Sequence, residues 1–292
     1  MQTNAIQIRD PFILKAEGQY YLFGSTDKDI WKSDGVGFDA YVSRDLTQWE
    51  GPIEAFRPPA GFWGTKNFWA PEVFHYGGAY YMFASFIGDG YKRGTAILRA
   101  ERPGGPYLPW SGGPVTPRDW MCLDGTLYID EAGEPWIVFC HEWVQIGDGT
   151  VCGARLTRDL KASKGEPLTL FSSSEASWSG LARSPSNNIE GHVTDGCYLH
   201  RLENGTLLML WSCAGPEGYC IGYARSETGT LLGPWRQSET PLFAKDGGHG
   251  MIFRDYDGRL LLTIHTPNKT PLERAVFFEL EETADGVRLA GA

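Results

Sequence analysis

Three carboxylates stand at the start of short apolar segments, each beside a residue that favours a turn. Asp10 precedes a proline, and Asp124 and Glu190 each precede a glycine. A carboxylate at the start of an apolar strand is costly to bury unless it has a partner or a task. Cleavage of a glycosidic bond needs two carboxyl groups, one ionised to activate water and one protonated to release the leaving group. A third carboxylate nearby can keep that acid protonated through like-charge repulsion.

A single acidic residue at such a position is usually a solvated turn residue. Here, however, the three carboxylates occupy equivalent places in an internal repeat. Each unit has a polar head, a short apolar strand, a turn that is mostly glycine-containing, and a second apolar or aromatic strand. The heads fall at positions 10, 72, 124, 190 and 249, at intervals of 62, 52, 66 and 59 residues. Further strands are expected between the hairpins, at Phe38–Ser43, Thr95–Ala100, Thr150–Leu156 and Tyr219–Ala224.

The repeat predicts the architecture. One hairpin cannot bury its own face, so neighbouring units must stack. A period near 60 residues matches a four-stranded antiparallel blade, and five blades in a ring form a β-propeller. We therefore expect an all-β fold, with residues 1–292 forming a single five-bladed β-propeller domain. Its innermost strands would bring heads that are remote in sequence together at one end of the axis. A β-sandwich of similar composition is the alternative, and it does not explain the period.

Composition excludes several classes of protein. The 292 residues include 36 acidic and 26 basic side chains, which give a formal charge of −10. Nucleic acid or an anionic membrane surface is therefore not expected as a partner. No apolar stretch is long enough to span a bilayer. A hydrophobic content of 42% with 21% charged residues excludes wholesale disorder.

The cysteines and the N-terminus suggest a cellular location. Most of the six cysteines lie in apolar runs, and none has the spacing of a metal site, so we expect reduced core thiols. Residues 1–4 show no basic segment followed by an apolar one. We therefore expect a cytoplasmic protein, unless a secretion signal has been removed.

Five short motifs, in this order and at blade spacing, resemble glycoside hydrolase family 43. The similarity extends over about 270 residues. It implies a five-bladed propeller and inverting hydrolysis of arabinose- or xylose-containing glycans, with no metal or organic cofactor needed for the chemistry. The motifs are Arg9–Ile13, Trp69–Glu72, Leu123–Gly125, Glu190–His192 and Gly248–Gly250.

The resemblance also implies catalytic roles for the three carboxylates. Asp10 would be the general base and Glu190 the general acid. Asp124 would position the acid and tune its pKa. Inversion suits this use of Asp10, because an inverting enzyme activates a water molecule instead of attacking the sugar directly.

Three further residues match the family pattern with less specificity. Trp69 resembles the aromatic wall of the sugar pocket, and a core tryptophan is the alternative. Arg274 resembles an arginine that binds sugar hydroxyls, and a plain surface arginine is the alternative. His249 resembles an axial histidine that in some members binds calcium through water. A structural Ca²⁺ in the central channel, held through His249, is therefore an option that the resemblance opens.

The expected substrate is a plant cell-wall-derived oligosaccharide containing arabinose or xylose. Two aromatic loops, Asp27–Asp39 and Ala55–Phe68, flank the first heads and favour a closed pocket. We therefore expect an exo-acting enzyme that releases terminal α-L-arabinofuranose, β-D-xylose or both. We expect no second β-sandwich domain of the kind that some family xylosidases carry, and this favours arabinofuranosidase. The alternatives are an endo-1,5-α-L-arabinanase and a catalytically silent carbohydrate-binding propeller.

Overall fold

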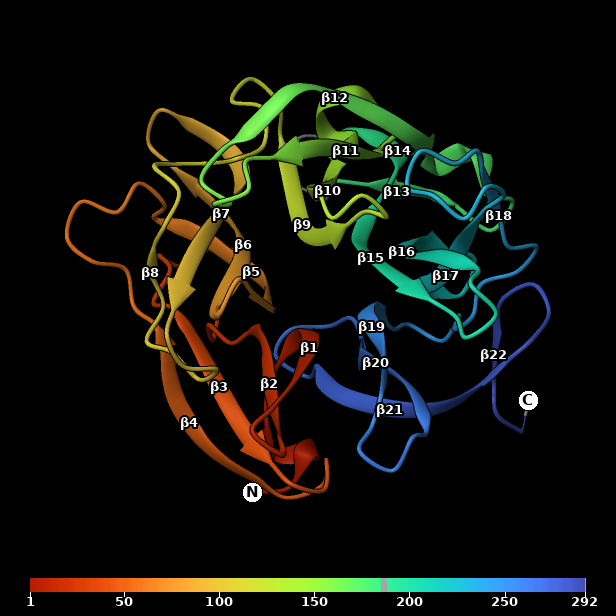
Figure 1. Ribbon diagram of the computed structural model, residues 1–292. Helices are drawn as coiled ribbons and strands as arrows, with labels where there is room; N and C mark the ends of the chain where they lie inside the picture. The colour runs from red at the N-terminus through yellow and green to blue at the C-terminus, as the bar shows by residue number, and fades with distance from the viewer. Residues whose placement is uncertain (185–187, 292) are drawn as a thin grey trace.

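The chain forms five four-stranded sheets set around a common axis (Figure 1). The computed structural model describes residues 1–184 and 188–291. Within each sheet the strands pair antiparallel in chain order, from an innermost strand at the axis to an outermost strand at the rim. This arrangement confirms the five-bladed β-propeller predicted from the repeat.

The strand bounds are as follows. Blade 1 contains β1 (Arg9–Ala16), β2 (Gln19–Ser25), β3 (Phe38–Ser43) and β4 (Trp49–Phe56). Blade 2 contains β5 (Lys66–Tyr76), β6 (Ala79–Gly88), β7 (Tyr91–Ala100) and β8 (Leu108–Pro109). Blade 3 contains β9 (Cys122–Ile129), β10 (Pro135–His141), β11 (Thr150–Leu156) and β12 (Ser163–Ser172). Blade 4 contains β15 (Asp195–Arg201), β16 (Leu207–Gly215), β17 (Gly218–Ser226) and β18 (Trp235–Gln237). Blade 5 contains β19 (Gly248–Arg254), β20 (Leu260–Thr266), β21 (Arg274–Glu282) and β22 (Val287–Leu289).

The remaining described elements are short. They are the 3₁₀ turns η1 (Thr3–Ala5) and η2 (Ser173–Glu175), the single-turn helix α1 (Trp143–Ile146), and a separate hairpin of β13 (Leu181–Arg183) and β14 (Glu190–His192). Among the described residues, no helix has the length and apolar character needed to cross a membrane.

Apolar side chains pack between neighbouring blades. Strand β10 is buried along its whole length, whereas most of the rim strand β12 is exposed. Strands that are covered on both faces read as continuous apolar runs, which is why β10 shows no polar alternation. The core of the propeller is therefore a ring of inter-blade layers, and the polar heads lie at one end of it.

Each innermost strand has a register irregularity near its start. Pairing with the second strand shifts after Arg9 in β1 and after Asp195 in β15, and at corresponding places in the other blades. Such β-bulges turn a side chain away from the regular pleat. The residues with positive φ at these points are Asp10 (54°), Ala70 (46°), Asp124 (56°), Gly196 (56°) and His249 (45°).

The backbone N–H at each of these points donates to a side chain of the preceding blade. Three of the acceptors are serine hydroxyls on second strands: Ala70 binds Ser25 Oγ at 2.9 Å, Asp124 binds Ser85 Oγ at 2.8 Å, and His249 binds Ser212 Oγ at 2.9 Å. Asp10 N–H donates to Nδ1 of His265 in blade 5 at 3.1 Å, which links the first and last blades. Gly196 N–H donates to Oδ2 of Asp124 at 2.9 Å. These bonds fix the heads relative to one another.

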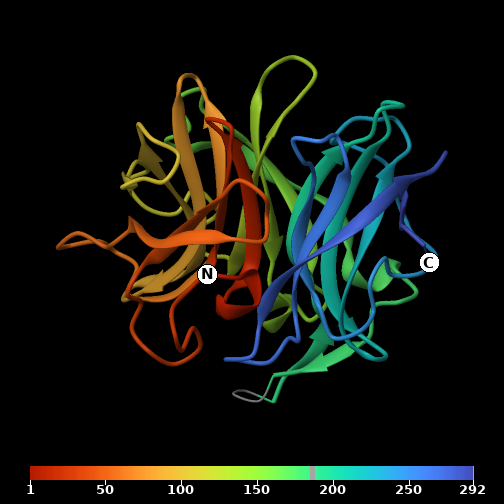
Figure 2. The same ribbon diagram turned by 90° about the horizontal axis from the view of Figure 1, so that it is seen from below.

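One head differs from the sequence prediction. The innermost strand of blade 4 begins at Asp195, and Glu190 lies outside the blades, on β14. His192 N–H donates to Gly147 O at 3.0 Å, and Gly149 N–H donates to His192 O at 2.8 Å. These bonds attach the hairpin to the β10–β11 connection, which lies at the end of the ring where β9 begins. Figure 2 shows the hairpin projecting below the ring.

Candidate active site

Asp10 and Asp124 meet at the axis, where His249 lies between them. Nδ1 of His249 is 3.2 Å from Oδ1 of Asp10 and 3.6 Å from Oδ2 of Asp124. The Asp10 and Asp124 side chains are only 7% and 3% exposed. The bulges of β1, β9 and β19 thus bring together residues that are more than 100 positions apart.

The surroundings of Asp10 favour its ionised form. Ser25 Oγ–H donates to Oδ2 of Asp10 at 2.6 Å. Burial would raise the pKa of Asp10, but the neighbouring His249, Arg9 and His265 and the Ser25 hydrogen bond outweigh it, so the pKa lies below its usual 3.8. Asp10 is therefore a carboxylate at neutral pH, the state that a general base requires.

A network of hydrogen bonds between blades 1 and 5 fixes the backbone at Asp10. Because Nδ1 of His265 accepts the Asp10 N–H, its proton lies on Nε2, which is 3.2 Å from Oδ1 of Asn268. Burial lowers the pKa of His265 to about 3, so the ring is neutral. Nη1 of Arg9 donates to Asn268 Oδ1 at 2.7 Å and to Glu273 Oε1 at 2.9 Å.

Asp124 has the opposite electrostatic character from Asp10. Burial raises the pKa of Asp124 to about 7, and the charge of Asp10 adds to the rise, while hydrogen bonds from Asp195 and Gly196 oppose it. Burial and the charge of Asp124 also raise the pKa of Asp195 well above 3.8. Tyr219 O–H donates to Oδ2 of Asp195 at 2.6 Å. The axial site therefore holds carboxyl groups in different protonation states at neutral pH.

Asp195 is the main functional candidate that the sequence analysis missed. Asp195 precedes a glycine in the same way as Asp124 and Glu190 do. The acid–glycine pattern thus occurs twice within a few residues, and the prediction took the first copy as the strand head. The start of the apolar strand immediately after Asp195 is the signal that distinguishes the second copy.

Glu190 occupies a different kind of position from the two axial aspartates. It is exposed and pairs with Arg183 across the β13–β14 hairpin. His192 of the same strand contacts Ser179 through Nδ1 at 3.1 Å. The hairpin stands at the catalytic end of the propeller, but Glu190 is not part of the buried axial cluster. Its role as the general acid stays a prediction.

Trp69 is half-buried in β5, directly before Ala70 at the bulge of that strand, and it contacts one aromatic and one cationic neighbour. Its indole N–H donates to Ile30 O at 2.8 Å. The Arg93 guanidinium carbon lies 4.3 Å from the centre of the Trp69 ring, and the Trp31 ring meets Trp69 edge-on at 5.1 Å. Trp69 also packs against a buried apolar cluster that includes Leu123, and its role as a wall of the sugar pocket stays a prediction.

Arg93 belongs to an ion pair that borders the site. Its Nη1 donates to Oε1 of Glu142, and its Nη2 donates to Asn67 Oδ1 at 3.1 Å. Burial raises the pKa of Glu142, Arg93 opposes this effect, and the charge of Asp195 adds to it. Arg93 lies in β7 of blade 2, and Glu142 directly follows β10 of blade 3. The sequence analysis did not identify this pair, because no sequence motif links two residues that meet only when the blades pack together.

Arg274 lies outside the axial cluster. Its Nε donates to Asn4 O at 2.8 Å, and its Nη1 donates to Glu273 O at 2.7 Å and to Pro271 O at 3.1 Å. The guanidinium therefore fastens the start of β21 to the N-terminal turn η1. The expected role of Arg274 in binding sugar hydroxyls stays a prediction, and Arg9 is the arginine that directly precedes Asp10 in β1.

His249 and two aspartates form the one group among the described residues that could contact a cation. Ligand atoms of Asp124, Asp195 and His249 lie within 4.8 Å of one another. Oδ2 of Asp124 already accepts Gly196 N–H, and Oδ2 of Asp195 accepts Tyr219 O–H. Calcium needs six to eight oxygen ligands. Asp124, Asp195 and His249 offer one ligand atom each, so a calcium ion at this place would need water molecules to complete its coordination.

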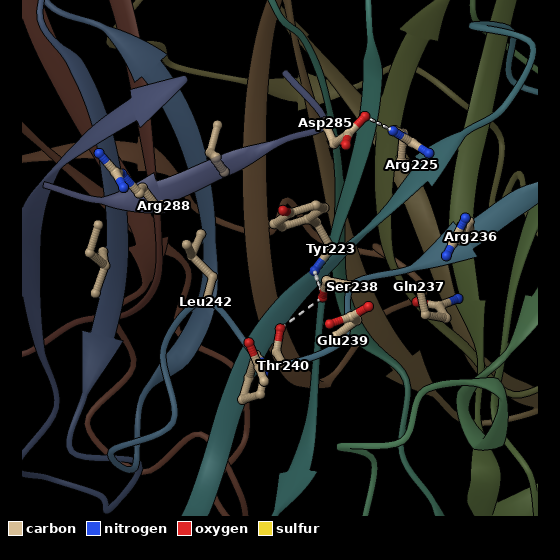
Figure 3. Close-up of a pocket in the computed structure, with 13 residues that line it drawn as sticks. Tyr223, Arg225, Arg236, Gln237, Ser238, Glu239, Thr240, Leu242, Asp285 and Arg288 are labelled. Atoms are coloured by element: carbon tan, nitrogen blue, oxygen red, sulfur yellow. Dashed lines mark hydrogen bonds and ion pairs between the residues drawn. The ribbon is translucent and has the colours of Figure 1, made fainter. Parts of the chain in front are cut away.

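A separate hollow lies between the outer parts of blades 4 and 5 (Figure 3). It has a volume of about 500 Å³ and is lined by β17, β18, β22 and adjoining loops. Arg225 pairs with Asp285 at its edge. None of the residues lining it belongs to the axial cluster.

An ionised carboxylate beside a protonatable carboxyl group at the axial end of a propeller suits the acid–base chemistry of glycoside hydrolysis. The chain belongs to glycosyl hydrolases family 43, because the model of that family matches residues 3–287. The sequence resemblance is thereby confirmed.

Two solved structures and one curated protein illustrate the relationship. An endo-arabinase from Bacteroides thetaiotaomicron is 40% identical, the match covers 98% of each chain, and the TM-score is 0.91. A thermostable family-43 glycoside hydrolase is 26% identical, with 100% of this chain and 96% of the other covered and a TM-score of 0.82. The extracellular endo-α-(1→5)-L-arabinanase 1 of Bacillus subtilis is 23% identical over 260 residues, which cover 82% of this chain and 71% of that protein.

Proposed function

We propose that this chain is an endo-acting α-1,5-L-arabinanase that hydrolyses its substrate with inversion. The observation that carries the hydrolytic part is the pairing of an ionised Asp10 with a protonatable Asp124 across His249. The preference for arabinan is supported by the 40% identical endo-arabinase, whose match covers nearly the whole of both chains. This reading was the alternative from sequence, and we now prefer it to an exo-acting enzyme.

The proposed mechanism uses side chains only. Asp10 removes a proton from a water molecule that attacks the anomeric carbon from the side opposite the leaving group. Glu190 donates a proton to the departing oxygen. Asp124 and Asp10 flank His249, and the high pKa of Asp124 allows it to hold a proton, which limits the negative charge of the site.

His249 keeps the two aspartates apart and in a fixed orientation. Its ring packs against Gly196, where a Cβ would lie 2.6 Å from Cγ of His249. Only glycine fits this contact with a φ of +56°. A cation, where bound, would be held through water beside His249 and would supply positive charge near the carboxylates. None of the proton transfers above requires it.

The test is the product pattern from linear α-1,5-arabinan. An endo-acting enzyme should lower the viscosity early and release a ladder of oligosaccharides, and the new reducing ends should first appear as the inverted anomer by NMR. Asp10→Asn serves as the inactive control. Release of arabinose alone would support the exo-acting arabinofuranosidase, and activity only on xylosides or galactosides would contradict the arabinan preference. Binding without cleavage would support a silent propeller.

A further inference from the structure

Trp31 is an exposed aromatic side chain held in one place beside Arg9, the residue that directly precedes Asp10. It lies in the β2–β3 connection, which begins beside Asp10 because β2 runs antiparallel to β1. The residue is 51% exposed. Its indole N–H nevertheless donates to Thr270 Oγ1 at 2.9 Å. The centres of the Trp31 and Trp69 rings lie 5.1 Å apart in an edge-to-face arrangement.

The loop is organised around this side chain. Oδ1 of Asp29 accepts the backbone N–H of Trp31 at 3.1 Å. The carbonyl of Ile30 accepts two side-chain hydrogen bonds from blade 2, from Trp69 Nε1 at 2.8 Å and from Asn67 Nδ2 at 3.2 Å. Trp31 is thus fixed to blade 2 through its preceding residue and to the β20–β21 connection through its own indole nitrogen.

A hydrogen-bonded chain connects Trp31 to the base. Thr270 Oγ1 accepts the indole N–H and donates to Oε1 of Glu273 at 2.6 Å. The same Glu273 oxygen accepts Nη1 of Arg9 at 2.9 Å, and the Arg9 guanidinium lies 5.1 Å from the Trp31 ring centre. Arg9 directly precedes Asp10 in β1. The position of the exposed ring is therefore coupled to the backbone that carries the general base.

We propose that Trp31 is the stacking platform for an arabinofuranosyl residue bound next to the sugar at the axial carboxylates. This inference rests on the proposed arabinanase function. The apolar C–H face of a furanose packs on an aromatic ring, and the only polar atom of the indole is already bonded to Thr270. A preorganised exposed ring binds a sugar without the entropic cost of ordering a mobile side chain. Trp31 would thus favour chains over single sugars.

The experiment compares Trp31→Ala and Trp31→Phe with a matched control. The control is Tyr256→Ala: Tyr256 is 47% exposed and carries a cation 4.5 Å above its ring, from Lys15. It lies in the β19–β20 turn, at the opposite end of β19 from His249. The measured quantities are kcat and KM on linear arabino-oligosaccharides of increasing length, with Kd measured in an Asp10→Asn background.

We expect Trp31→Ala to raise KM and Kd for long oligosaccharides by about tenfold, the size expected for one aromatic contact. The loss should shrink on the shortest cleaved substrate, Trp31→Phe should retain most of the affinity, and Tyr256→Ala should match the wild type. Unchanged Kd, or an equal loss at every chain length, would overturn the proposal. A wild-type protein inactive on arabinan would refute the proposed function itself, and this inference with it.

Discussion

Replacing Asp124 with asparagine should make the protein more stable above neutral pH while it removes activity. Asparagine keeps the shape of the side chain, and its carbonyl oxygen can still accept the Gly196 N–H that Asp124 now binds at 2.9 Å. What it removes is a buried charge next to Asp10. The variant therefore loses the free-energy cost of burying the Asp124 charge while it keeps the hydrogen bond to Gly196.

The magnitude follows from the pKa of Asp124, which rises from 3.8 to about 7 on folding. A group whose pKa is higher in the folded state stabilises the fold fully below its unfolded pKa and loses that contribution as the pH rises through the folded pKa. At about 1.4 kcal/mol per pH unit, the loss above pH 7 has a ceiling of roughly 4 kcal/mol. Asp124 and Asp195 interact, so the two carboxyl groups titrate together and only part of this ceiling belongs to Asp124. We therefore expect the unfolding free energy of the asparagine variant to be about 2 kcal/mol higher than that of the wild type.

The assay is thermal and urea unfolding of the wild type and Asp124→Asn in chelator-treated buffer, near pH 5 and near pH 8. The difference in unfolding free energy should grow between these two pH values, and Tm of the variant near pH 8 should exceed that of the wild type by roughly 3 °C. An advantage that is absent, or that is larger near pH 5, would refute the reasoning.

Asp255→Asn is the matched control. Asp255 is also buried, but hydrogen bonds from Arg259 and Asp257 and the charge of Arg259 outweigh its burial, so its pKa is lowered. Its stabilising contribution is present above the unfolded pKa and is lost as the pH falls. Asparagine at this position should therefore destabilise the protein near pH 8, and the two variants should shift Tm in opposite directions.

Two further predictions concern the acid and the thiols. Glu190→Gln should slow substrates with poor leaving groups far more than activated aryl glycosides, because only the former need proton donation; equal losses on both would reject Glu190 as the acid. All six cysteines are buried and free, so six thiols should titrate in denaturant without reductant. Four would indicate a disulfide between Cys213 and Cys220, whose Sγ atoms lie 3.6 Å apart, and two or fewer would contradict a cytoplasmic location.

The blades were predictable because their strands are defined locally. Phe38–Ser43 and Thr150–Leu156 have the bounds expected from sequence, since each is a run of strand-forming residues between turn residues. Asp10 and Asp124 were found because an acid at the start of an apolar run is conspicuous. Glu190 was misplaced in the fold for the same reason, since its pattern is repeated at Asp195.

The rest of the site could not be read from the chain, because it depends on contacts between blades. Trp69 was a candidate from its motif, but the residues around it, Trp31 and Arg93, come from two other segments, and their packing is set by hydrogen bonds such as that from Trp69 to Ile30. Arg274 illustrates the converse case. Its motif suggested a sugar ligand, but in the folded chain its donors bind the backbone carbonyls of Asn4, Pro271 and Glu273, and the contact to Asn4 spans 270 positions of sequence.

The hydrogen bonds that join the blades also explain why the catalytic groups lie where they do. Three blades present a serine as the acceptor for the next blade, but the corresponding positions are Cys140 in blade 3 and His265 in blade 5. A thiol is a weak acceptor, and Gly196 N–H instead binds the carboxylate of Asp124. His265 in turn accepts the N–H of Asp10. The two blades that lack this serine are therefore the ones whose inter-blade hydrogen bonds involve Asp124 and Asp10. The same residues join neighbouring blades and form the axial site. Substitutions at Cys140 or His265 would therefore alter the geometry of catalysis as well as the stability of the fold.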